Sequence, residues 1–273
     1  GRMQITSSAN PKIKEIRKLR ERKARQESGL FYVEGLRHVM EASQQQAAIE
    51  TLVVAPELLS SAVGREFAAA QQRQGVPVLE VSAEVFAGLA LKDGPQGLAA
   101  VVRQRWWGPE AVRGGLWAAL DAVADPGNLG TILRTLDAVG GEGVILLDHS
   151  TDPYDPTAVR ASMGAVFTQK LVKMSFEAFA AWKQAGGLPV VGTSDRGPQD
   201  YHYQTYPEAM VLLMGSERQG LQPQHLALCD ALVRIPMQGQ CDSLNLAVAA
   251  AVVLYEIYNH RRDGQAGRLG GER

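Results

Sequence analysis

The stretch "CDSLNLAVAAAVVLYEIYN", residues 241–259, joins a short polar turn to a long apolar segment. Ser243 in the turn stands where helices commonly begin, because a serine hydroxyl can accept a hydrogen bond from an unpaired backbone N–H. The residues that follow are apolar around most of a helix circumference, which predicts a helix covered on more than one side. Their unbroken apolar run, residues 246–254, is about half the ~20 residues that a membrane span requires. We therefore expect a buried helix of a globular domain and no membrane partner.

The composition is that of a globular protein, since 45% of the 273 residues are hydrophobic and 21% are charged. This length predicts two domains, because a single core rarely grows beyond about 250 residues. Cys229 and Cys241 have no CxxC spacing, so neither a disulfide framework nor a cysteine metal site is expected. No apolar signal segment follows the basic start, and a reducing, cytoplasmic location is the expectation. No metal is predicted, because ligand spacing is missing among His38, His149, His202, His225 and His260.

Positive charge is concentrated near the start of the chain, where residues 12–25 ("KIKEIRKLRERKAR") contain eight basic and two acidic side chains. The net charge of the chain is −1, so the remainder is acidic. Ile13, Ile16 and Leu19 recur at three-residue spacing, which predicts an amphipathic helix with a cationic outer face. That face is either solvated or contacts the phosphates of a nucleic acid. The residues predicted to make such contacts are Lys12, Lys14, Arg17, Lys18, Arg22 and Arg25.

Strand and helix patterns alternate along the chain, which predicts an α/β fold in two parts. The smaller α/β domain is predicted over residues 1–105, with strands at 29–35, 49–55, 76–82 and 97–105 and helices at 36–45 and 56–74. Residues 106–114 ("WWGPEAVRG") are predicted as a linker, whose two tryptophans either stack on bases or pack at the domain junction. A second α/β domain is predicted over residues 115–262, followed by a disordered tail over 263–273.

The strands of the second domain are continuous apolar runs, as expected for a parallel sheet that is covered on both faces. They are predicted at residues 115–123, 143–148, 188–194, 209–215 and 231–237, with helices at 131–140 and 156–167. Ligands of such sheets bind beyond the carboxyl ends of the strands. Three polar loops follow these ends: "DPGNLG" (125–130), "GSERQGL" (215–221) and "QGQCDSLN" (238–245).

The first loop contains more than a helix start requires. Pro126 and Gly127 turn the chain, and Asn128 can cap the helix that follows. Arg134 lies six positions after Asn128, about 9 Å along a helix, and helical side chains lean toward the N-terminus. Its guanidinium can therefore return to the loop and, together with the helix dipole, bind an anion such as a phosphate.

The other two loops also follow apolar strand ends. Gly215 allows a ligand to approach the backbone closely, and Gly220 permits an unusual turn. Glu217 between them is either a solvated surface side chain or part of a site. The third loop follows a strand end that contains Ile235 and Met237. Taken singly, each loop is weak evidence for a site.

Together, the three loops resemble the three motifs of the SpoU/TrmH family of RNA methyltransferases, within the SPOUT superfamily. The first motif matches in Asn128, Gly130, Arg134, Thr135 and Gly140; the second in Gly215, Glu217, Gly220 and Leu221; the third in Ile235, Pro236, Met237, Gly239, Ser243, Leu244 and Asn245. "VRASMGAVF", residues 159–167, is similar to the family's intervening segment and contains Arg160. The front of the chain resembles the accessory RNA-binding domain of the ribosomal RNA branch. Leu136 and Asp137 depart from the pattern, which bears on helix packing rather than chemistry, and Ala247 stands where serine is frequent, which does not affect the matched residues.

The resemblance implies a trefoil-knotted parallel-sheet methyltransferase domain behind a smaller α/β RNA-binding domain. It also implies a homodimer through the C-terminal domain, with the apolar closing helix covered by the second subunit. The implied reaction is methyl transfer from S-adenosylmethionine to a ribose 2′-hydroxyl, with large-subunit (23S-type) ribosomal RNA as the favoured substrate. A transfer RNA substrate and a non-catalytic RNA-binding factor are the alternatives. A nucleotide-dependent oxidoreductase is disfavoured, because no GxGxxG occurs.

The resemblance also assigns roles to residues. Donor binding is expected at the backbone of Gly215, Ile235, Met237 and Leu244, with Thr193 added as a further candidate, and RNA contact at Arg160 as well as on the basic helix. A guanidinium is rarely deprotonated in a protein, so we expect Arg134 to grip phosphate and stabilise the developing oxyanion rather than to accept the proton. In this hypothesis Glu217 orients Arg134, and the ribose and donor are fixed by Asn128, Ser243 and Asn245.

Overall fold

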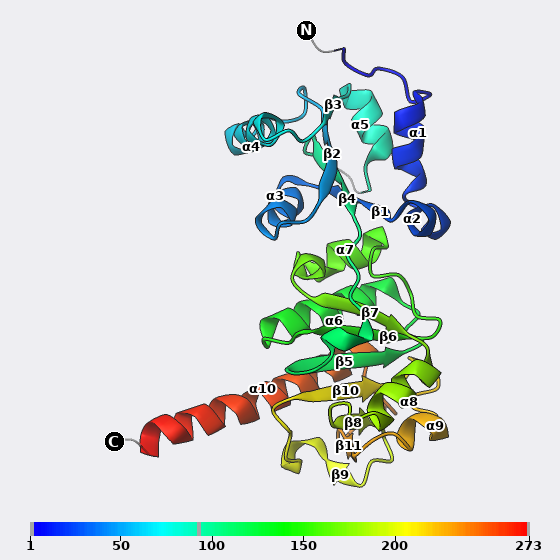
Figure 1. The fold of residues 1–273 in the computed structure, drawn as a ribbon, viewed down its shortest axis with the longest axis vertical. Helices are drawn as coiled ribbons and strands as arrows, with labels where there is room; N and C mark the ends of the chain where they lie inside the picture. Colours follow the sequence, from blue (N-terminus) through cyan, green and yellow to red (C-terminus); the bar gives the residue numbers. More distant parts are fainter. Residues whose placement is uncertain (1–2, 92–93, 272–273) are drawn as a thin grey trace. The chain divides into compact units, whose positions relative to one another are not determined.

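The computed structural model describes residues 3–91 and 94–271 (Figure 1). The chain divides into two compact units. The first contains the residues up to Arg105 together with Tyr154–Phe167, and the second contains Trp106–Pro153 together with the residues from Thr168 onward. Residues 154–167 were predicted as part of the second domain, whereas in the structure they pack with the first unit.

A four-stranded sheet with the order β1-β4-β2-β3 forms the centre of the first unit. Strand β4 pairs antiparallel with β1 and β2, whereas β3 pairs parallel with β2. These strands are β1 (Leu30–Glu34), β2 (Ile49–Val54), β3 (Val78–Glu80) and β4 (Leu98–Arg103). The helices are α1 (Pro11–Lys18), α2 (Arg22–Ser28), α3 (Leu36–Gln44), α4 (Ala62–Arg73), α5 (Ala83–Leu89), α7 (Pro156–Ser162) and the 3-10 turn η2 (Ala165–Phe167). The predicted small α/β domain is confirmed.

The basic segment forms two helices where the sequence predicted one. Helix α1 begins after Asn10, whose side chain accepts a hydrogen bond from the Lys12 N–H, and it ends at Lys18. Ile13, Ile16 and Leu19 are buried in the core of the first unit, as their spacing predicts. The lysines of α1 point to solvent.

Arg25 is a correction to the predicted RNA contacts, because its side chain is only 2% exposed. Its guanidinium donates to the carbonyls of Leu19 and Arg20, at 3.0 and 2.9 Å, where the first helix ends. It also lies 3.8 Å from the carboxylate of Asp155. Arg25 therefore satisfies the carbonyls at a helix end, which is a structural role.

Residues 154–167 pack on the first unit through aromatic rings. The ring of Phe31 on β1 lies 4.4 Å from that of Tyr154 and 6.0 Å from that of Phe167, measured between centroids. The Tyr154 hydroxyl donates to the Arg105 carbonyl at 2.7 Å and accepts from its N–H at 2.9 Å. These contacts join residues that are far apart in the sequence. A local helix pattern therefore could not assign the segment to this unit.

The second unit contains a seven-stranded sheet with the order β7-β6-β5-β10-β8-β11-β9, in which every adjacent pair is parallel. Figure 1 shows strands β6, β5 and β10 side by side. The predicted parallel sheet is therefore confirmed. Its strands are β5 (Leu116–Asp121), β6 (Gly143–Leu147), β7 (Lys170–Met174), β8 (Val190–Thr193), β9 (Gln199–Asp200), β10 (Met210–Met214) and β11 (Ala231–Arg234).

Helices of the second unit connect these parallel strands and cover them. They are α6 (Pro126–Ala138), α8 (Phe176–Gln184), α9 (Pro223–Leu226) and α10 (Leu246–Gly271), with 3-10 turns η1 (Pro109–Ala111) and η3 (Tyr201–Tyr203). Helices α6 and α10 pack against each other. The predicted closing helix is confirmed, since Ala250, Val253, Leu254 and Ile257 of α10 are fully buried. No helix in the described residues is apolar over enough of its length to cross a membrane.

Two predicted boundaries differ from the structure. Residues 106–114, predicted as a linker, belong to the second unit: the Trp107 N–H donates to the Leu171 carbonyl at 2.9 Å, and Lys173 lies over the Trp106 ring. The segment predicted as a disordered tail continues helix α10 to Gly271, with residues 272–273 outside the described residues. The segment contains no proline, so no residue in it blocks the backbone hydrogen bonds of the helix.

Candidate active site

The carboxyl ends of β8, β10 and β11 surround a cavity of about 640 Å³. All five residues predicted to bind a donor line it, as do Glu217 and Ser243. The cavity is also lined by four residues that the motifs do not contain as matched positions, Asp195, Gln219, Arg234 and Asp242. These four are polar residues in loops or at a strand end, so proximity to the matched motifs was the available signal. A cavity of this size and position suits a nucleoside-sized ligand.

A series of side-chain hydrogen bonds joins the three polar loops. The Asn245 Nδ2 donates to Asn128 Oδ1 at 3.2 Å, and the Asn128 Nδ2 donates to Glu217 Oε1 at 3.4 Å. The Glu217 carboxylate also accepts from the backbone N–H groups of Ala124 and Asp125, each at 3.3 Å. Loops that lie about 90 and 117 residues apart in sequence therefore meet at one point.

Both helix caps beside this series differ from the sequence expectation. Asp125 rather than Asn128 caps α6, since its carboxylate accepts from the Gly127 N–H at 2.7 Å. Asn245 rather than Ser243 holds the start of α10, since its Oδ1 accepts from the N–H groups of Ala247 and Val248. The Asn128 side chain is thereby left to join the loops, and the Ser243 side chain lies at the cavity.

Hydrogen bonds determine the ionisation of Glu217. Partial burial acts to raise the pKa of its carboxyl, but backbone N–H groups of Glu217, Ala124 and Asp125 and the Asn128 amide act in the other direction. Their combined effect lowers the pKa below the ordinary value of 4.5. The carboxylate is therefore stabilised in its charged, accepting form, as the hydrogen-bond series requires.

The turn that contains Glu217 depends on two glycines. A Cβ on Gly215 would lie 2.0 Å from the backbone carbon of Gly220, so a larger residue would push the turn open. Gly220 itself has φ +62°, a conformation that side chains disfavour. Ser216 and Gly220 pair across the turn as an antiparallel bridge. The close approach predicted at Gly215 is thus an approach of backbone to backbone.

Arg134 lies on the exposed side of α6 and makes no hydrogen bond or ion pair within the part of the chain that the structure describes. Glu217 and Arg134 form no hydrogen bond or ion pair in the described residues, so the orienting role stays a prediction. The Glu217 carboxylate accepts from the 124–125 backbone and from Asn128.

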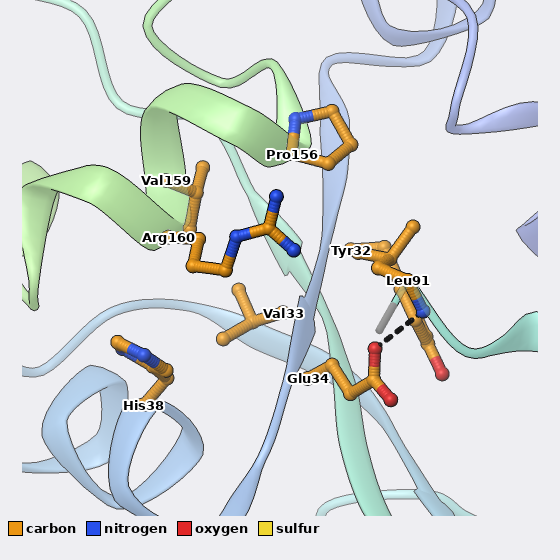
Figure 2. A pocket seen from close by; sticks show the side chains of 8 residues that line it. All are labelled: Tyr32, Val33, Glu34, His38, Leu91, Pro156, Val159 and Arg160. Atoms are coloured by element: carbon orange, nitrogen blue, oxygen red, sulfur yellow. Dashed lines mark hydrogen bonds between the residues drawn. The ribbon is translucent and has the colours of Figure 1, made fainter. Parts of the chain in front are cut away.

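The predicted RNA contacts differ in their exposure. Lys12, Lys14, Lys18 and Arg22 are exposed, and Arg17 is half-buried. Arg160 is exposed on α7 and lines a small cavity of the first unit with Tyr32, Glu34 and His38. Figure 2 shows the Arg160 side chain extending from α7 toward Tyr32 and Glu34. Burial raises the pKa of the Tyr32 hydroxyl far above its usual range, with the Glu34 charge as a second cause.

In the described residues, His, Cys, Asp and Glu side chains form no group that could hold a metal ion. His225 is the fully buried histidine, and it contacts Asp121. His202 and His260 both contact Glu256, at 2.9 and 2.8 Å.

The fold and site define an α/β protein with a ligand cavity at the carboxyl edge of a parallel sheet and a separate α/β accessory unit. Residues 115–255 match the model of the SpoU rRNA Methylase family, and residues 10–100 match an MRM3-like substrate binding domain. The chain belongs to the SpoU rRNA methylase family. The family resemblance inferred from the motifs is therefore confirmed.

Several relatives are similar over nearly their whole length. The 23S rRNA (guanosine(2553)-2′-O)-methyltransferase RlmP of Bacillus subtilis is 30% identical over 254 residues, which cover 93% of this chain and 98% of that protein. The structure of an AdoMet-bound rRNA methyltransferase from Sinorhizobium meliloti is 39% identical with a TM-score of 0.86, covering 94% of this chain and 98% of that one. The SpoU methyltransferase AviRb from Streptomyces viridochromogenes, solved with AdoMet, is 28% identical with a TM-score of 0.81, covering 92% and 98%.

Glu217→Gln is expected to change how stability depends on pH. Because the folded-state pKa of Glu217 is lowered, its contribution to stability is complete above pH 4.5 and is lost as pH falls through the folded-state pKa. Melting temperatures between about pH 2 and pH 8 should differ most between wild type and E217Q above pH 4.5, and should converge in acid. Glu66→Gln on α4 is the control at an exposed ion pair. A difference that stays constant over this range would contradict the assignment.

Proposed function

We propose that this chain transfers a methyl group from S-adenosylmethionine to a ribose 2′-hydroxyl of large-subunit ribosomal RNA. The observation that carries the proposal is the hydrogen-bond series Asn245–Asn128–Glu217, which joins the first motif loop to the two motif loops that line the cavity. The RlmP and AviRb relatives named above support the reaction class, and the similarity to an MRM3-like substrate binding domain supports an RNA substrate.

The cavity fits S-adenosylmethionine in its chemistry. Its apolar lining includes Met214, Leu221, Ile235, Met237 and Leu244, which suits a nucleobase. Asp195, Glu217 and Asp242 add negative charge, which suits the sulfonium and ammonium groups of this donor. Backbone groups at Gly215, Ile235, Met237 and Leu244 would hold the adenosine part, with Thr193 beside them. When bound, the donor supplies an activated methyl carbon.

The residues of this chain mainly position the reactants and stabilise charge. A ribose hydroxyl is a weak nucleophile, so aligning its oxygen with the methyl carbon provides much of the rate. Charge disappears as an oxyanion meets a sulfonium, and an apolar lining favours that change. Arg134 grips the target phosphate and stabilises the developing oxyanion, while Asn128, Ser243 and Asn245 fix the ribose and the donor. Glu217 serves this arrangement by holding the loop at 124–128.

A homodimer through the C-terminal unit completes the proposal. Helix α10 buries Val253 and Leu254 but exposes Val248 and Tyr255, which are 49% and 44% accessible. A second subunit on this face would remove that apolar surface from water. It would also provide an orienting partner for Arg134. The trefoil knot stays a prediction, as does a cytoplasmic location, which the free cysteines Cys229 and Cys241 support.

Methyl transfer is tested by mapping ribose methylation on ribosomal and transfer RNA with and without the protein. We expect one ribosomal site to be methylated by wild type, and single-turnover rates for Arg134→Met and Arg134→Lys to fall by about 10² or more, because one oxyanion contact is worth that much. Calorimetry with S-adenosylhomocysteine should give unchanged affinity for both variants. If only transfer RNA were methylated, transfer RNA rather than ribosomal RNA would be the substrate. Donor binding without any methylation would favour a non-catalytic factor. A lysine variant at near-full rate would exclude the bidentate grip.

The cationic face of α1 is tested by charge removal, since deleting the segment would also remove core residues. Replacing Lys12, Lys14 and Lys18 by glutamine should weaken RNA binding and reduce the slope of log affinity against log salt by about 0.7 to 0.9 per lost phosphate contact. Donor affinity should be unchanged. Arg73→Gln on α4, in an exposed ion pair of the same unit, is the control. An unchanged slope would leave α1 a solvated face.

The dimer is tested by placing charge on the exposed face of α10. Val248→Glu combined with Tyr255→Glu should convert a dimer into a monomer in sedimentation equilibrium, because a carboxylate cannot be buried there without a partner. Val63→Glu is the matched control, since Val63 is 60% exposed on α4 in the first unit. A wild-type chain that sediments as a monomer would overturn this part of the proposal.

A further inference from the structure

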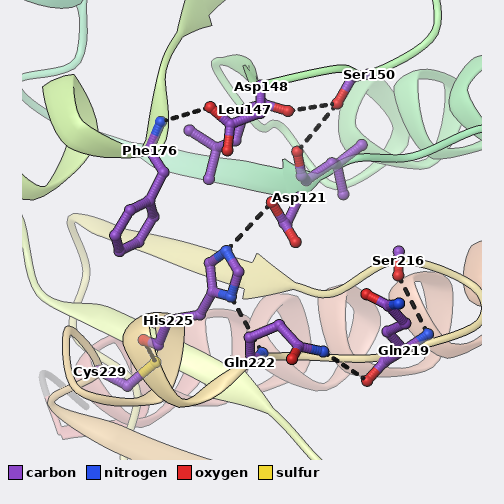
Figure 3. Close-up of polar contacts among 11 residues, drawn as sticks. Asp121, Leu147, Asp148, Ser150, Phe176, Ser216, Gln219, Gln222, His225 and Cys229 are labelled. Carbon is purple, nitrogen blue, oxygen red and sulfur yellow. Dashed lines mark hydrogen bonds and ion pairs between the residues drawn. The ribbon is translucent and has the colours of Figure 1, made fainter.

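A buried histidine and a buried aspartate lie beside the loop whose residues line the cavity, and Figure 3 shows the two side chains with Gln219 and Gln222 of this loop. Asp121 is the last residue of β5, and His225 lies in the short helix α9 that follows the 215–222 loop. His225 is 2% exposed, and its Nε2 lies 3.2 Å from Asp121 Oδ1. The ring of Phe176 packs edge-on against the imidazole, with centroids 4.9 Å apart. The pair therefore links the ends of two adjacent strands, β5 and β10, through the loops that follow them.

The contacts of His225 define the orientation of its ring. The backbone N–H of Gln222 donates to His225 Nδ1 at 3.1 Å, so Nδ1 is the acceptor nitrogen. Nε2 faces the Asp121 carboxylate at 3.2 Å, at ion-pair distance but without a well-aligned hydrogen bond. The aspartate orients the ring, as a carboxylate does for a metal-bound or catalytic histidine.

The Gln222 N–H belongs to the loop that forms one wall of the cavity. Glu217, Gln219 and Leu221 of this loop line the cavity. The contacts continue inward from Gln222, whose side chain donates to the Gln219 carbonyl at 3.4 Å, and the Gln219 N–H donates to the Ser216 hydroxyl at 3.2 Å. The loop is therefore held at its tip by Glu217 and at its far end by His225. Both anchors lead to the segment 121–128 that starts the first motif.

The Gln222–His225 contact is part of the capping box that starts α9 and stabilises that helix, but stability alone is a poor reason for burying the His225–Asp121 pair. Two buried polar side chains lose their hydration, and apolar residues of similar volume often stabilise a core as well or better. What an apolar pair cannot do is accept the Gln222 N–H in a fixed direction. The geometry fits a role in orientation.

From these contacts we infer that His225, oriented by Asp121, is a positioning residue that holds the 216–222 wall of the donor cavity in its binding form. The inference rests on the proposed function, because it identifies the cavity ligand as S-adenosylmethionine. Neither side chain lines the cavity, so the effect on the donor is transmitted through the loop backbone.

The test compares two amides that differ by one methylene group. In His225→Asn the side-chain oxygen stands near the Nδ1 position and can accept the Gln222 N–H, but the amide is too short to reach Asp121. His225→Gln presents an acceptor and a donor with the spacing of the two imidazole nitrogens and can reach both partners. Calorimetry with S-adenosylhomocysteine and steady-state methylation of RNA are the measurements.

We expect H225N to raise the dissociation constant for S-adenosylhomocysteine and the donor KM about tenfold, which corresponds to one buried hydrogen bond. H225Q should stay within about threefold of wild type, and the KM for RNA should be unchanged in both. Lys183→Met is the stability control: it removes a 2.6 Å ion pair with Asp230 in the same unit and should lower the melting temperature without changing donor affinity.

Wild-type affinity in folded H225N, or equal losses in H225N and H225Q, would overturn the inference while leaving the proposed function intact. If H225N does not fold, Asp121→Leu and Asp121→Asn give the same comparison from the other partner, since only asparagine keeps an oxygen facing Nε2. Loss of affinity is then expected in D121L alone. A wild-type chain that binds no S-adenosylhomocysteine would overturn the proposed function and this inference with it.

Discussion

The site depends on two asparagine amides that each act as donor and acceptor at once. Asn245 accepts the N–H groups that start α10 and donates to Asn128, which in turn donates to Glu217. The charge on Glu217 is kept by backbone N–H groups from the loop before α6. Each hydrogen bond in the series Asn245–Asn128–Glu217 therefore forms only when the neighbouring side chain has one particular orientation. An amide can accept from a helix start with its oxygen and donate to a neighbouring loop with its nitrogen, which suits asparagine at position 245.

The parallel sheet makes this meeting possible. Adjacent parallel strands deliver their following loops to one edge, and β5 lies beside β10, which lies beside β8. The cavity is at this edge, and the buried Asp121–His225 pair lies beside the loop that lines it. Three layers therefore follow one another from the core outward. The buried Asp121–His225 pair is innermost, the 216–222 loop lies next to it, and the cavity lies beyond the loop. Apolar strands carry the loops, while the hydrogen bonds set their positions.

Several residues have roles that local patterns could not distinguish. Arg25 belongs to a basic run, yet its guanidinium lies inside the first unit and holds the carbonyls at the end of α1. Residues 154–167 read as a helix between two strands of one domain, but Phe31 draws them to the other unit. His225 looked like one of five scattered histidines, because its partner Asp121 is 104 positions away in sequence. In each case a contact distant along the chain decides the role.

The sequence by itself determined the two α/β parts, the parallel character of the second sheet, the closing helix and the family. Apolar periodicity can be read within a short segment, and the motifs can be read from their order along the chain. It also identified part of the cavity lining, because matched motifs keep their order along the chain, but it did not identify Asp195, Gln219, Arg234 and Asp242. Only the tertiary structure decided which of Asn128 and Asp125 caps α6, which partner Glu217 takes, and where residues 106–114 and 154–167 pack. Hydrogen-bond choice and packing depend on which groups meet in space, and the competing partners here are equally good in sequence terms.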